Sequence, residues 1–274
     1  ILEAFFADGT LIGLEYFKTM DKMERFLDIP MLRLVLDGEW QEVHHTDRFL
    51  WWYKLQAATF DAFTLHNLCI HGQIETLKWC FSRLQDTTTF HLLPELAAEN
   101  GHLHILQWLF AKGFLFNFWA ADNAAKNGHL ETLQWVMSNG GTWTHWAADG
   151  AAKNGHLETL QWIRAQGGPW TFWAADGAAE NNHLTTLQWV MSNGGEWTDY
   201  AADGAAKNGH LDVLKWIRQE GGPWTHYAAD SAAENGHLDT VKWIRGENGP
   251  FTDQGIYWAQ TNGHDDVLKW LTAN

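Results

Sequence analysis

Residues 151–163 read Ala-Ala-Lys-Asn-Gly-His-Leu-Glu-Thr-Leu-Gln-Trp-Ile, and close copies of this stretch recur through most of the 274-residue chain. Aligned on Gly-His-Leu, the copies fall at Gly72, Gly101, Gly128, Gly155, Asn182, Gly209, Gly236 and Gly263. The first spacing is slightly longer than the others, and every later spacing is identical. A tryptophan follows each aligned position seven residues later. A fixed period between about 20 and 50 residues indicates a repeat array.

Each repeat predicts two short helices joined by a turn. The first helix carries small residues on one face, such as Ala175, Ala178 and Ala179, and the second carries a bulkier apolar stripe. A helix pair of this size cannot bury its own apolar face, so the repeats must stack on one another. The sequence therefore predicts an all-α solenoid, with about eight repeats over residues 61–274 and an irregular helical cap over residues 1–60.

The turn between the two helices gives a sharper prediction about the backbone. Asn182 stands where the other repeats have glycine, and asparagine is the residue with a side chain that best tolerates a positive φ angle. We therefore expect a positive φ angle at all eight turn positions. The Gly-Gly pair after the second helix is expected to supply the left-handed conformation that ends a helix.

The run Ala-Ala-Lys-Asn-Gly-His-Leu-Glu-Thr-Leu resembles the centre of an ankyrin repeat, and Thr64-Leu65-His66 in the first repeat keeps a further part of that pattern. The resemblance implies a protein-binding array without enzymatic activity. An ankyrin repeat has about 33 residues and the repeat of this chain about 27 residues, so the long β-hairpin fingers are expected to be absent. Short repeats joined by Gly-x-Pro-Trp look like the ankyrin-like arrays of giant viruses and some protists.

Charge and composition exclude several classes of partner. The chain has 18 Lys and Arg against 33 Asp and Glu, a formal charge of −15, which disfavours binding to nucleic acid or anionic lipid. It instead favours a protein partner with a basic surface. The two cysteines, Cys69 and Cys80, and the lack of a long apolar run indicate a cytoplasmic protein without a membrane span.

One aspartate recurs at the same position in the first helix of five repeats, and it admits two interpretations. In the functional interpretation the carboxylates form an acidic stripe that contacts a basic partner. In the structural interpretation, which we favour because the position does not vary, each carboxylate accepts hydrogen bonds from the next turn and joins two repeats. The residues of this Asp row are Asp122, Asp149, Asp176, Asp203 and Asp230.

Positions that vary between otherwise similar repeats are candidates for partner contact. Residues 129–155 and 183–209 differ at only 4 of 27 positions, so a variable position is either free in solvent or adapted to a partner. Two phenylalanines at one such position favour contact, because exposed aromatic residues often anchor interfaces. We call this position the variable register, and its residues are Phe118, His145, Phe172, Asp199 and His226. A second variable set is Lys126, Lys153, Glu180, Lys207 and Glu234.

Two further series, in histidine and tryptophan, are interpreted as structural. The seven histidines from His102 to His264 lie one per repeat, too far apart to share a metal ion, and are expected to order the turns. The loop aromatics, Trp143 and its equivalents through Phe251, are expected to pack across the junctions between repeats. The sequence contains no phosphate-binding loop or hydrolase motif, and we predict no catalytic residue, cofactor or metal site.

The predicted function is a scaffold that binds another protein through the repeat surface. One alternative is a structural component of a virus particle that associates with itself. A third hypothesis is a ubiquitin-ligase adaptor, for which Ile29-Pro30-Met31-Leu32 and Trp51-Trp52-Tyr53 give only a faint echo of an F-box. The sequence does not identify the partner.

Overall fold

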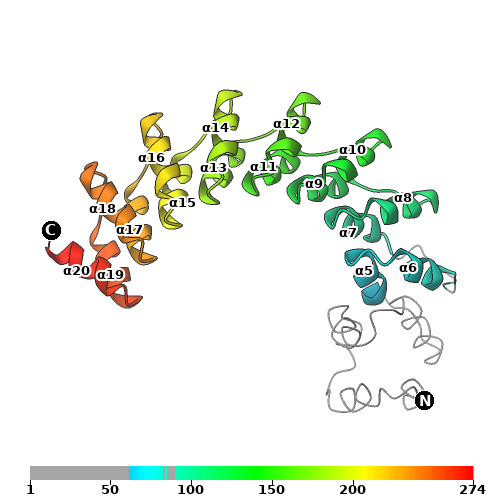
Figure 1. Cartoon of the computed structure of the whole chain (residues 1–274), viewed down its shortest axis with the longest axis horizontal. Helices are drawn as coiled ribbons and strands as arrows, with labels where there is room; N and C mark the ends of the chain where they lie inside the picture. The colour runs from blue at the N-terminus through cyan, green and yellow to red at the C-terminus, as the bar shows by residue number, and fades with distance from the viewer. Residues whose placement is uncertain (1–61, 83, 85–89, 274) are drawn as a thin grey trace, which may run out of the picture. The chain divides into compact units, whose positions relative to one another are not determined.

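The computed structural model describes residues 62–82, 84 and 90–273, and every regular element in these ranges is an α-helix (Figure 1). No strand occurs among them, so the junctions carry no β-hairpin fingers, as the short repeat predicts. The predicted cap and the two F-box-like segments lie outside the described residues. The sixteen helices form the pairs α5 (Ala62–Ile70) and α6 (Ile74–Phe81), α7 (Leu93–Glu99) and α8 (Leu103–Ala111), α9 (Phe118–Lys126) and α10 (Leu130–Ser138), α11 (His145–Lys153) and α12 (Leu157–Ala165), α13 (Trp173–Glu180) and α14 (Leu184–Ser192), α15 (Asp199–Lys207) and α16 (Leu211–Gln219), α17 (His226–Glu234) and α18 (Leu238–Gly246), and α19 (Asp253–Thr261) and α20 (Asp265–Ala273).

The chain divides into two compact units, residues 1–116 and residues 117–274. In the first unit, α5 packs against α7, and each of these helices packs against its own second helix. Leu65, Leu77, Leu93 and Leu106 are fully buried in this unit. Phe81 at the end of α6 contacts Trp108 of α8 edge to face, with ring centroids 5.0 Å apart. The first two repeats therefore have a core made of larger side chains than the repeats that follow.

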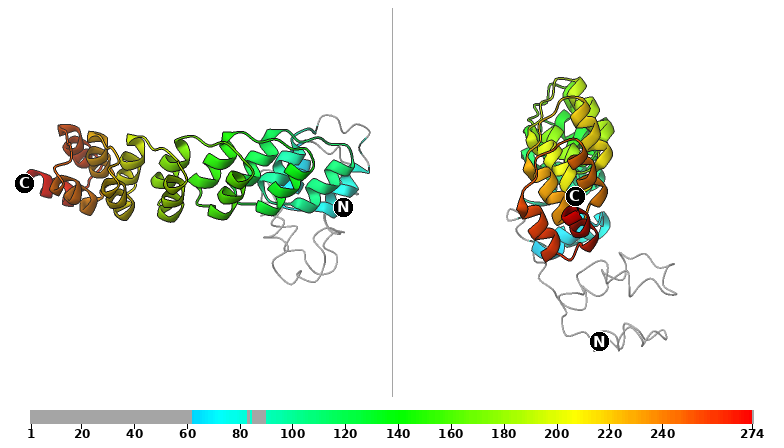
Figure 2. Two further views of the ribbon diagram at one scale, coloured as in Figure 1. Left: turned by 90° about the horizontal axis from the view of Figure 1, so that it is seen from above. Right: turned by 90° about the vertical axis from the view of Figure 1, so that its left-hand side faces the viewer.

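In the second unit the first helices of successive repeats stack side by side in one layer and the second helices form another layer (Figures 1 and 2). Alanine explains the close stacking of the first layer. Ala120, Ala121, Ala124 and Ala125 of α9 are fully buried, and the same four positions are alanine and buried in α11, α13, α15 and α17. Small side chains let helix backbones approach closely, while the second helices contribute the larger apolar residues. The fold is an all-α solenoid of stacked repeats.

The turn between the two helices has the predicted backbone conformation. All eight turn positions have a positive φ angle, which is 74° at Gly155 and 65° at Asn182. A second constraint acts at Gly155, because a β-carbon there would lie 2.5 Å from Nδ1 of His183 in the next repeat. Both the backbone angle and the neighbouring imidazole therefore select glycine at this turn.

The two glycines at each repeat junction have different roles. Gly167, the first of one pair, has a φ angle of 78° and ends α12 in the left-handed conformation. The second, Gly168, has no room for a side chain, since a β-carbon would lie 2.3 Å from Cγ2 of Ile163. In the last junction Asn248 replaces the first glycine and keeps a positive φ angle of 56°. The prediction for the Gly-Gly pairs is therefore confirmed.

Candidate interaction face

Each aspartate of the Asp row joins two successive repeats. Asp149 accepts hydrogen bonds from both the backbone N–H and the hydroxyl of Thr171, at 2.9 and 2.7 Å. The other four aspartates bind, in the same way, the threonine that lies 22 residues later in the chain. These hydrogen bonds confirm the structural interpretation of the row. The threonines are Thr144, Thr171, Thr198, Thr225 and Thr252.

Four of the five aspartates of this row are buried, and the fifth, Asp203, is half-buried. Asp176 is fully buried, and Asp122, Asp149 and Asp230 are at most 5% exposed. Burial raises the pKa of Asp122, Asp149, Asp176 and Asp203, and the hydrogen bonds from threonine only partly offset this rise. The row therefore does not form the exposed acidic stripe of the functional interpretation.

The threonines also cap the first helix of their own repeat. The hydroxyl of Thr144 accepts a hydrogen bond of 3.1 Å from the backbone N–H of Trp146, and Thr198 does the same for Tyr200. Such a cap satisfies one of the free N–H groups of a helix N-terminus. An aspartate in one repeat thus orients the first turn of the next repeat, and in α11, α13, α15 and α17 this turn carries a large aromatic side chain.

These aromatic side chains form an exposed row that the sequence interpretation missed. We define the aromatic row as Trp119, Trp146, Trp173, Tyr200 and Tyr227, one per repeat, with side chains between 38% and 57% exposed. In α9, Trp119, Asn123 and Lys126 share one helix face by their spacing, and the buried alanines occupy the opposite face. The row therefore lies on the face of the first helices that is turned away from the second helices.

The structure brings the variable register beside the aromatic row. The rings of Phe118 and Trp119 have centroids 5.0 Å apart, and the pairs His145–Trp146, Phe172–Trp173 and His226–Tyr227 are 5.1, 5.4 and 4.3 Å apart. Phe118 and Phe172 are themselves exposed. Each repeat thus presents a pair of side chains in which one member is always aromatic and the other varies. We call the aromatic row, the variable register and the second variable set together the inner face.

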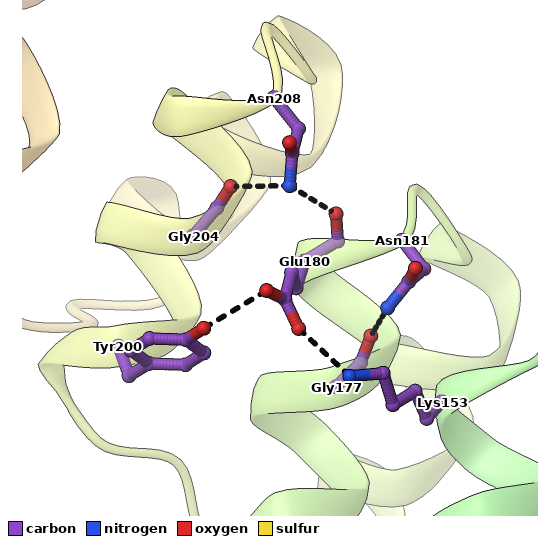
Figure 3. Close-up of polar contacts among 7 residues, drawn as sticks. All are labelled: Lys153, Gly177, Glu180, Asn181, Tyr200, Gly204 and Asn208. Carbon is purple, nitrogen blue, oxygen red and sulfur yellow. Dashed lines mark hydrogen bonds and ion pairs between the residues drawn. The ribbon is translucent and has the colours of Figure 1, made fainter. Parts of the chain in front are cut away.

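The second variable set forms a polar network across three repeats at Glu180 (Figure 3). The carboxylate of Glu180 accepts a 2.8 Å hydrogen bond from the hydroxyl of Tyr200 and pairs with Nζ of Lys153 at 3.2 Å. Its backbone carbonyl accepts a hydrogen bond from the side chain of Asn208. Burial alone would raise the pKa of Glu180, but the contacts with Tyr200 and Lys153 outweigh it and lower that pKa. The network fixes the orientation of Tyr200 within the aromatic row.

The histidine series orders the turns and occupies space left by glycine. In the first unit, Nε2 of His102 lies 2.9 Å from the carbonyl oxygen of Ile70 in the preceding repeat. In the second unit, the rings of His156, His183 and His237 fill the space where a β-carbon would stand on the preceding turn glycine. Burial lowers the pKa of His156, His183 and His210. The described residues contain no group of His, Cys, Asp or Glu that could hold a metal ion.

The paired helices, the left-handed Gly-His turn and the alanine-lined first helix are now all observed. This is the helix-turn-helix repeat that the resemblance in the sequence implied. In comparisons with known proteins, no protein-family model matches the sequence, and no curated protein matches it. Among solved structures, the chain is similar to the crystal structure of the human ASB11 ankyrin repeat domain. The sequence identity is 16% and the TM-score is 0.47, over 58% of this chain and 84% of that chain.

The loop aromatics of the array pack at the junctions, as predicted. Trp143 contacts Trp162 edge to face at 5.7 Å, and the pairs beginning at Trp170, Trp197 and Trp224 repeat this geometry. The guanidinium of Arg164 lies 4.1 Å from the ring centroid of Trp170 and donates a hydrogen bond to the carbonyl of Gly168. These half-buried rings therefore join successive repeats, in contrast to the more exposed aromatic row.

Among the described helices, none is both long enough and apolar enough to cross a membrane.

Proposed function

We propose that the chain is a non-enzymatic scaffold that binds another protein through the inner face of residues 117–274. The observation that carries this proposal is the row of five exposed aromatic side chains, each beside a residue that differs between repeats. Exposed tryptophan and tyrosine side chains are enriched among the residues that dominate binding energy at interfaces. A constant aromatic residue supplies contact area in every repeat, and its variable neighbour supplies specificity.

The variable register gives the proposed partner contacts Phe118, His145, Phe172, Asp199 and His226. The Asp row supports these contacts indirectly, because each buried carboxylate binds the threonine that caps a first helix. The net charge of −15 favours a partner with a basic surface, and association would then slow as salt screens the attraction. An association rate that does not change with ionic strength would remove this electrostatic part of the proposal.

The test is affinity purification with the wild-type chain and with a Trp146→Ala, Trp173→Ala double variant. Both side chains are about half exposed, so their loss should leave folding intact, which circular dichroism and thermal unfolding would verify. Trp162→Ala is the matched control, because it removes an equal ring from the second helix of the same repeat as Trp146. We expect the double variant alone to lose the partner; retention of the partner by that variant would contradict the proposal.

A second copy of the chain could also bind the exposed aromatic row. Light scattering on the Trp146→Ala, Trp173→Ala double variant and on the Trp162→Ala control separates self-association from binding of another protein. Finding the protein within purified virus particles would favour a structural role. Co-purification of ubiquitin-ligase subunits would favour the role of a ligase adaptor. The short Gly-Pro-Trp-linked repeats support the proposed origin in a giant virus. Cys69 is a buried free thiol, which supports a reducing, cytoplasmic setting.

A further inference from the structure

We propose that the second unit opens locally at two of its junctions, residues 139–144 and 193–198, and that the repeats on either side of these junctions move as blocks. The junctions between repeats are of two kinds, which differ in side-chain contacts, in hydrogen-bond length and in burial. The proposal concerns the chain without a partner, so it goes beyond the proposed scaffold function and does not depend on it.

Three junctions carry an arginine and a proline that hold the linker. The guanidinium of Arg164 donates a hydrogen bond to the carbonyl of Gly168, the residue before Pro169. The same guanidinium lies 4.1 Å from the ring centroid of Trp170. Opening the linker would break both contacts, and proline leaves the opened linker fewer conformations to gain. The equivalent residues in the other two junctions of this kind are Arg218, Gly222, Pro223 and Trp224, which make the same two contacts, and Arg245, Gly249, Pro250 and Phe251, where the guanidinium lies 5.5 Å from the ring centroid.

We call these three linkers, residues 166–171, 220–225 and 247–252, the clamped junctions. The linkers at 139–144 and 193–198, which we call the Met junctions, lack both residues. Met137 and Met191 stand at the arginine position, and Thr142 and Glu196 stand at the proline position. Methionine has no N–H group that could hold the glycine carbonyl, and neither threonine nor glutamate fixes its φ angle as proline does. The edge-to-face tryptophan pairs occur at both kinds of junction and do not distinguish them.

The end of the second helix is also looser at the Met junctions. The hydrogen bond from the N–H of Gly140 to the carbonyl of Met137 is 3.3 Å long, and so is the bond from Gly194 to Met191. The equivalent bonds at the clamped junctions are 3.0–3.1 Å long, and the bond from the following glycine is 2.8–2.9 Å long in both kinds. Protein N–H···O bonds are usually about 2.7–3.2 Å long, so one bond of each Met junction lies outside this range.

Burial separates the two kinds of junction in the same way. The second glycine of the pair is buried at every clamped junction, namely Gly168, Gly222 and Gly249, and half-buried at both Met junctions, namely Gly141 and Gly195. Exposed backbone hydrogen bonds with few buried contacts are typical of segments that open locally while the rest of a protein stays folded. The Met junctions are therefore the places where the second unit opens most easily.

The first helices stay stacked during such an opening. Aspartate–threonine hydrogen bonds cross both kinds of junction, and at residues 193–198 they join Asp176 to Thr198. On the inner face, the rings of Trp173 and Tyr200 are in edge contact, with centroids 5.6 Å apart. The second helices mainly contact the first helix of their own repeat, so they can separate without breaking these contacts. Opening would therefore move α14 away from α16, with α11 to α14 as one block and α15 to α20 as the next.

The experiment is native-state hydrogen exchange of the full 274-residue chain, followed by mass spectrometry and corrected for the intrinsic exchange rate of each amide. We expect the amides of residues 139–144 and 193–198 to be at least about tenfold less protected than those of residues 166–171 and 220–225. Equal protection at the two kinds of junction in the wild-type chain would overturn the proposal, whatever the variants show.

Exchanging the two side chains tests the cause. The Met191→Arg, Glu196→Pro variant should raise the protection of residues 193–198 to the level of residues 220–225. Among the described residues the backbone N–H of Glu196 donates no hydrogen bond, so proline removes none there. The Arg218→Met, Pro223→Glu variant should make the reverse change at residues 220–225. A Met191→Leu, Glu196→Ala variant is the matched control and should exchange like the wild-type chain.

The untouched Met junction at residues 139–144 is an internal control in each sample. If the arginine and proline raise protection equally at residues 139–144 and 193–198, the effect is a change in overall stability and the proposal is wrong. It is also wrong if the leucine–alanine control raises protection as much as the arginine–proline variant. Capture of a protein partner is a separate readout, so its failure would remove the scaffold function and leave the two kinds of junction unaffected.

Discussion

Asp176 of α13 accepts two hydrogen bonds from Thr198, one from its backbone N–H and one from its hydroxyl, although the two residues belong to different repeats. The same hydroxyl accepts the N–H of Tyr200 and so caps α15. The carboxylate is fully buried, whereas the contact between Glu180 and Tyr200 that also joins these two repeats is exposed. A single side chain therefore couples the stacking of the repeats to the position of an exposed aromatic ring.

Replacing Asp176 with alanine should lower the free energy of unfolding by about 2–4 kcal/mol, because Thr198 would lose both acceptors in a largely buried place. Asp176→Asn should lower it less, since the amide oxygen still accepts the backbone N–H and no buried charge remains. Chemical denaturation of both variants measures the two free energies of unfolding and shows which is lower. Equal stabilities for the alanine and asparagine variants would contradict a hydrogen-bonding role for this side chain.

Gly155→Ala should destabilise the array by roughly 1–3 kcal/mol, because alanine is strained at a positive φ angle. Its β-carbon would also meet the ring of His183. The chain offers its own control at the equivalent turn, where Asn182→Gly should be neutral or stabilise by up to about 1 kcal/mol. Thermal unfolding of the two variants measures the contrast, and a harmless Gly155→Ala variant would contradict it.

Acidification below about pH 6.5 should destabilise the array through its histidines. Burial first, and for His156 and His210 also neighbouring histidines, lower the pKa of His156, His183 and His210 in the folded chain. Unfolded histidine has a pKa of about 6.5, so the unfolded chain binds more protons just below that pH. The histidine contribution to stability is therefore complete above about pH 6.5 and is lost as the pH falls toward the lower folded pKa values.

The Asp row opposes this effect at lower pH. The raised pKa of Asp122, Asp149, Asp176 and Asp203 means that the folded chain takes up protons before the unfolded chain. The contribution of these four groups to stability therefore increases as the pH falls through that range. A triple His→Gln variant at positions 156, 183 and 210 should lose less stability between pH 7.5 and 5.5 than the wild-type chain. The comparison uses the change with pH, since glutamine also alters the absolute stability. An identical pH dependence would contradict the histidine assignment.

Tyr200→Phe should raise the pKa of Glu180, because it removes a hydrogen bond that favours the carboxylate. The change in overall stability should stay below about 1 kcal/mol, since the hydroxyl lies at the exposed face. Carboxyl-resolved NMR titration measures the pKa directly. Lys153→Met is the companion variant, because it removes the ion pair and should also raise the pKa of Glu180.

Most of the fold could be predicted from the sequence because its constraints are local. The positive φ angle at Asn182, the glycine pairs and the alanine faces are each properties of one short segment, and the constant period of the array repeats them. The structural role of each aspartate, as an acceptor of hydrogen bonds from the next turn, was also predictable. A position that does not vary between repeats favours such a role.

The aromatic row was missed for a physical reason. The position that Trp146 and Tyr200 occupy is aromatic in each repeat from α9 to α17. A search for positions that vary between repeats therefore passes over it. Their exposure depends on how the first helix is rotated against the second helix, which places the alanines on the buried side. The contact between Glu180 and Tyr200 likewise depends on the distance between repeats. The missed signal was an aromatic residue at the start of each first helix, on the face opposite the alanines.

The hydrogen bonds between aspartate and threonine also affect how an array of this kind can gain repeats in evolution. Each full repeat of the second unit from α11 to α17 carries a threonine that binds the repeat before it and an aspartate that binds the repeat after it. A duplicated segment such as residues 129–182 therefore arrives with matching connections at both ends and extends the inner face in phase. The near identity of residues 129–155 and 183–209 is the expected trace of such a copying event. Gene duplication alone can thus enlarge the array, because the added repeats form the same contacts as the existing ones.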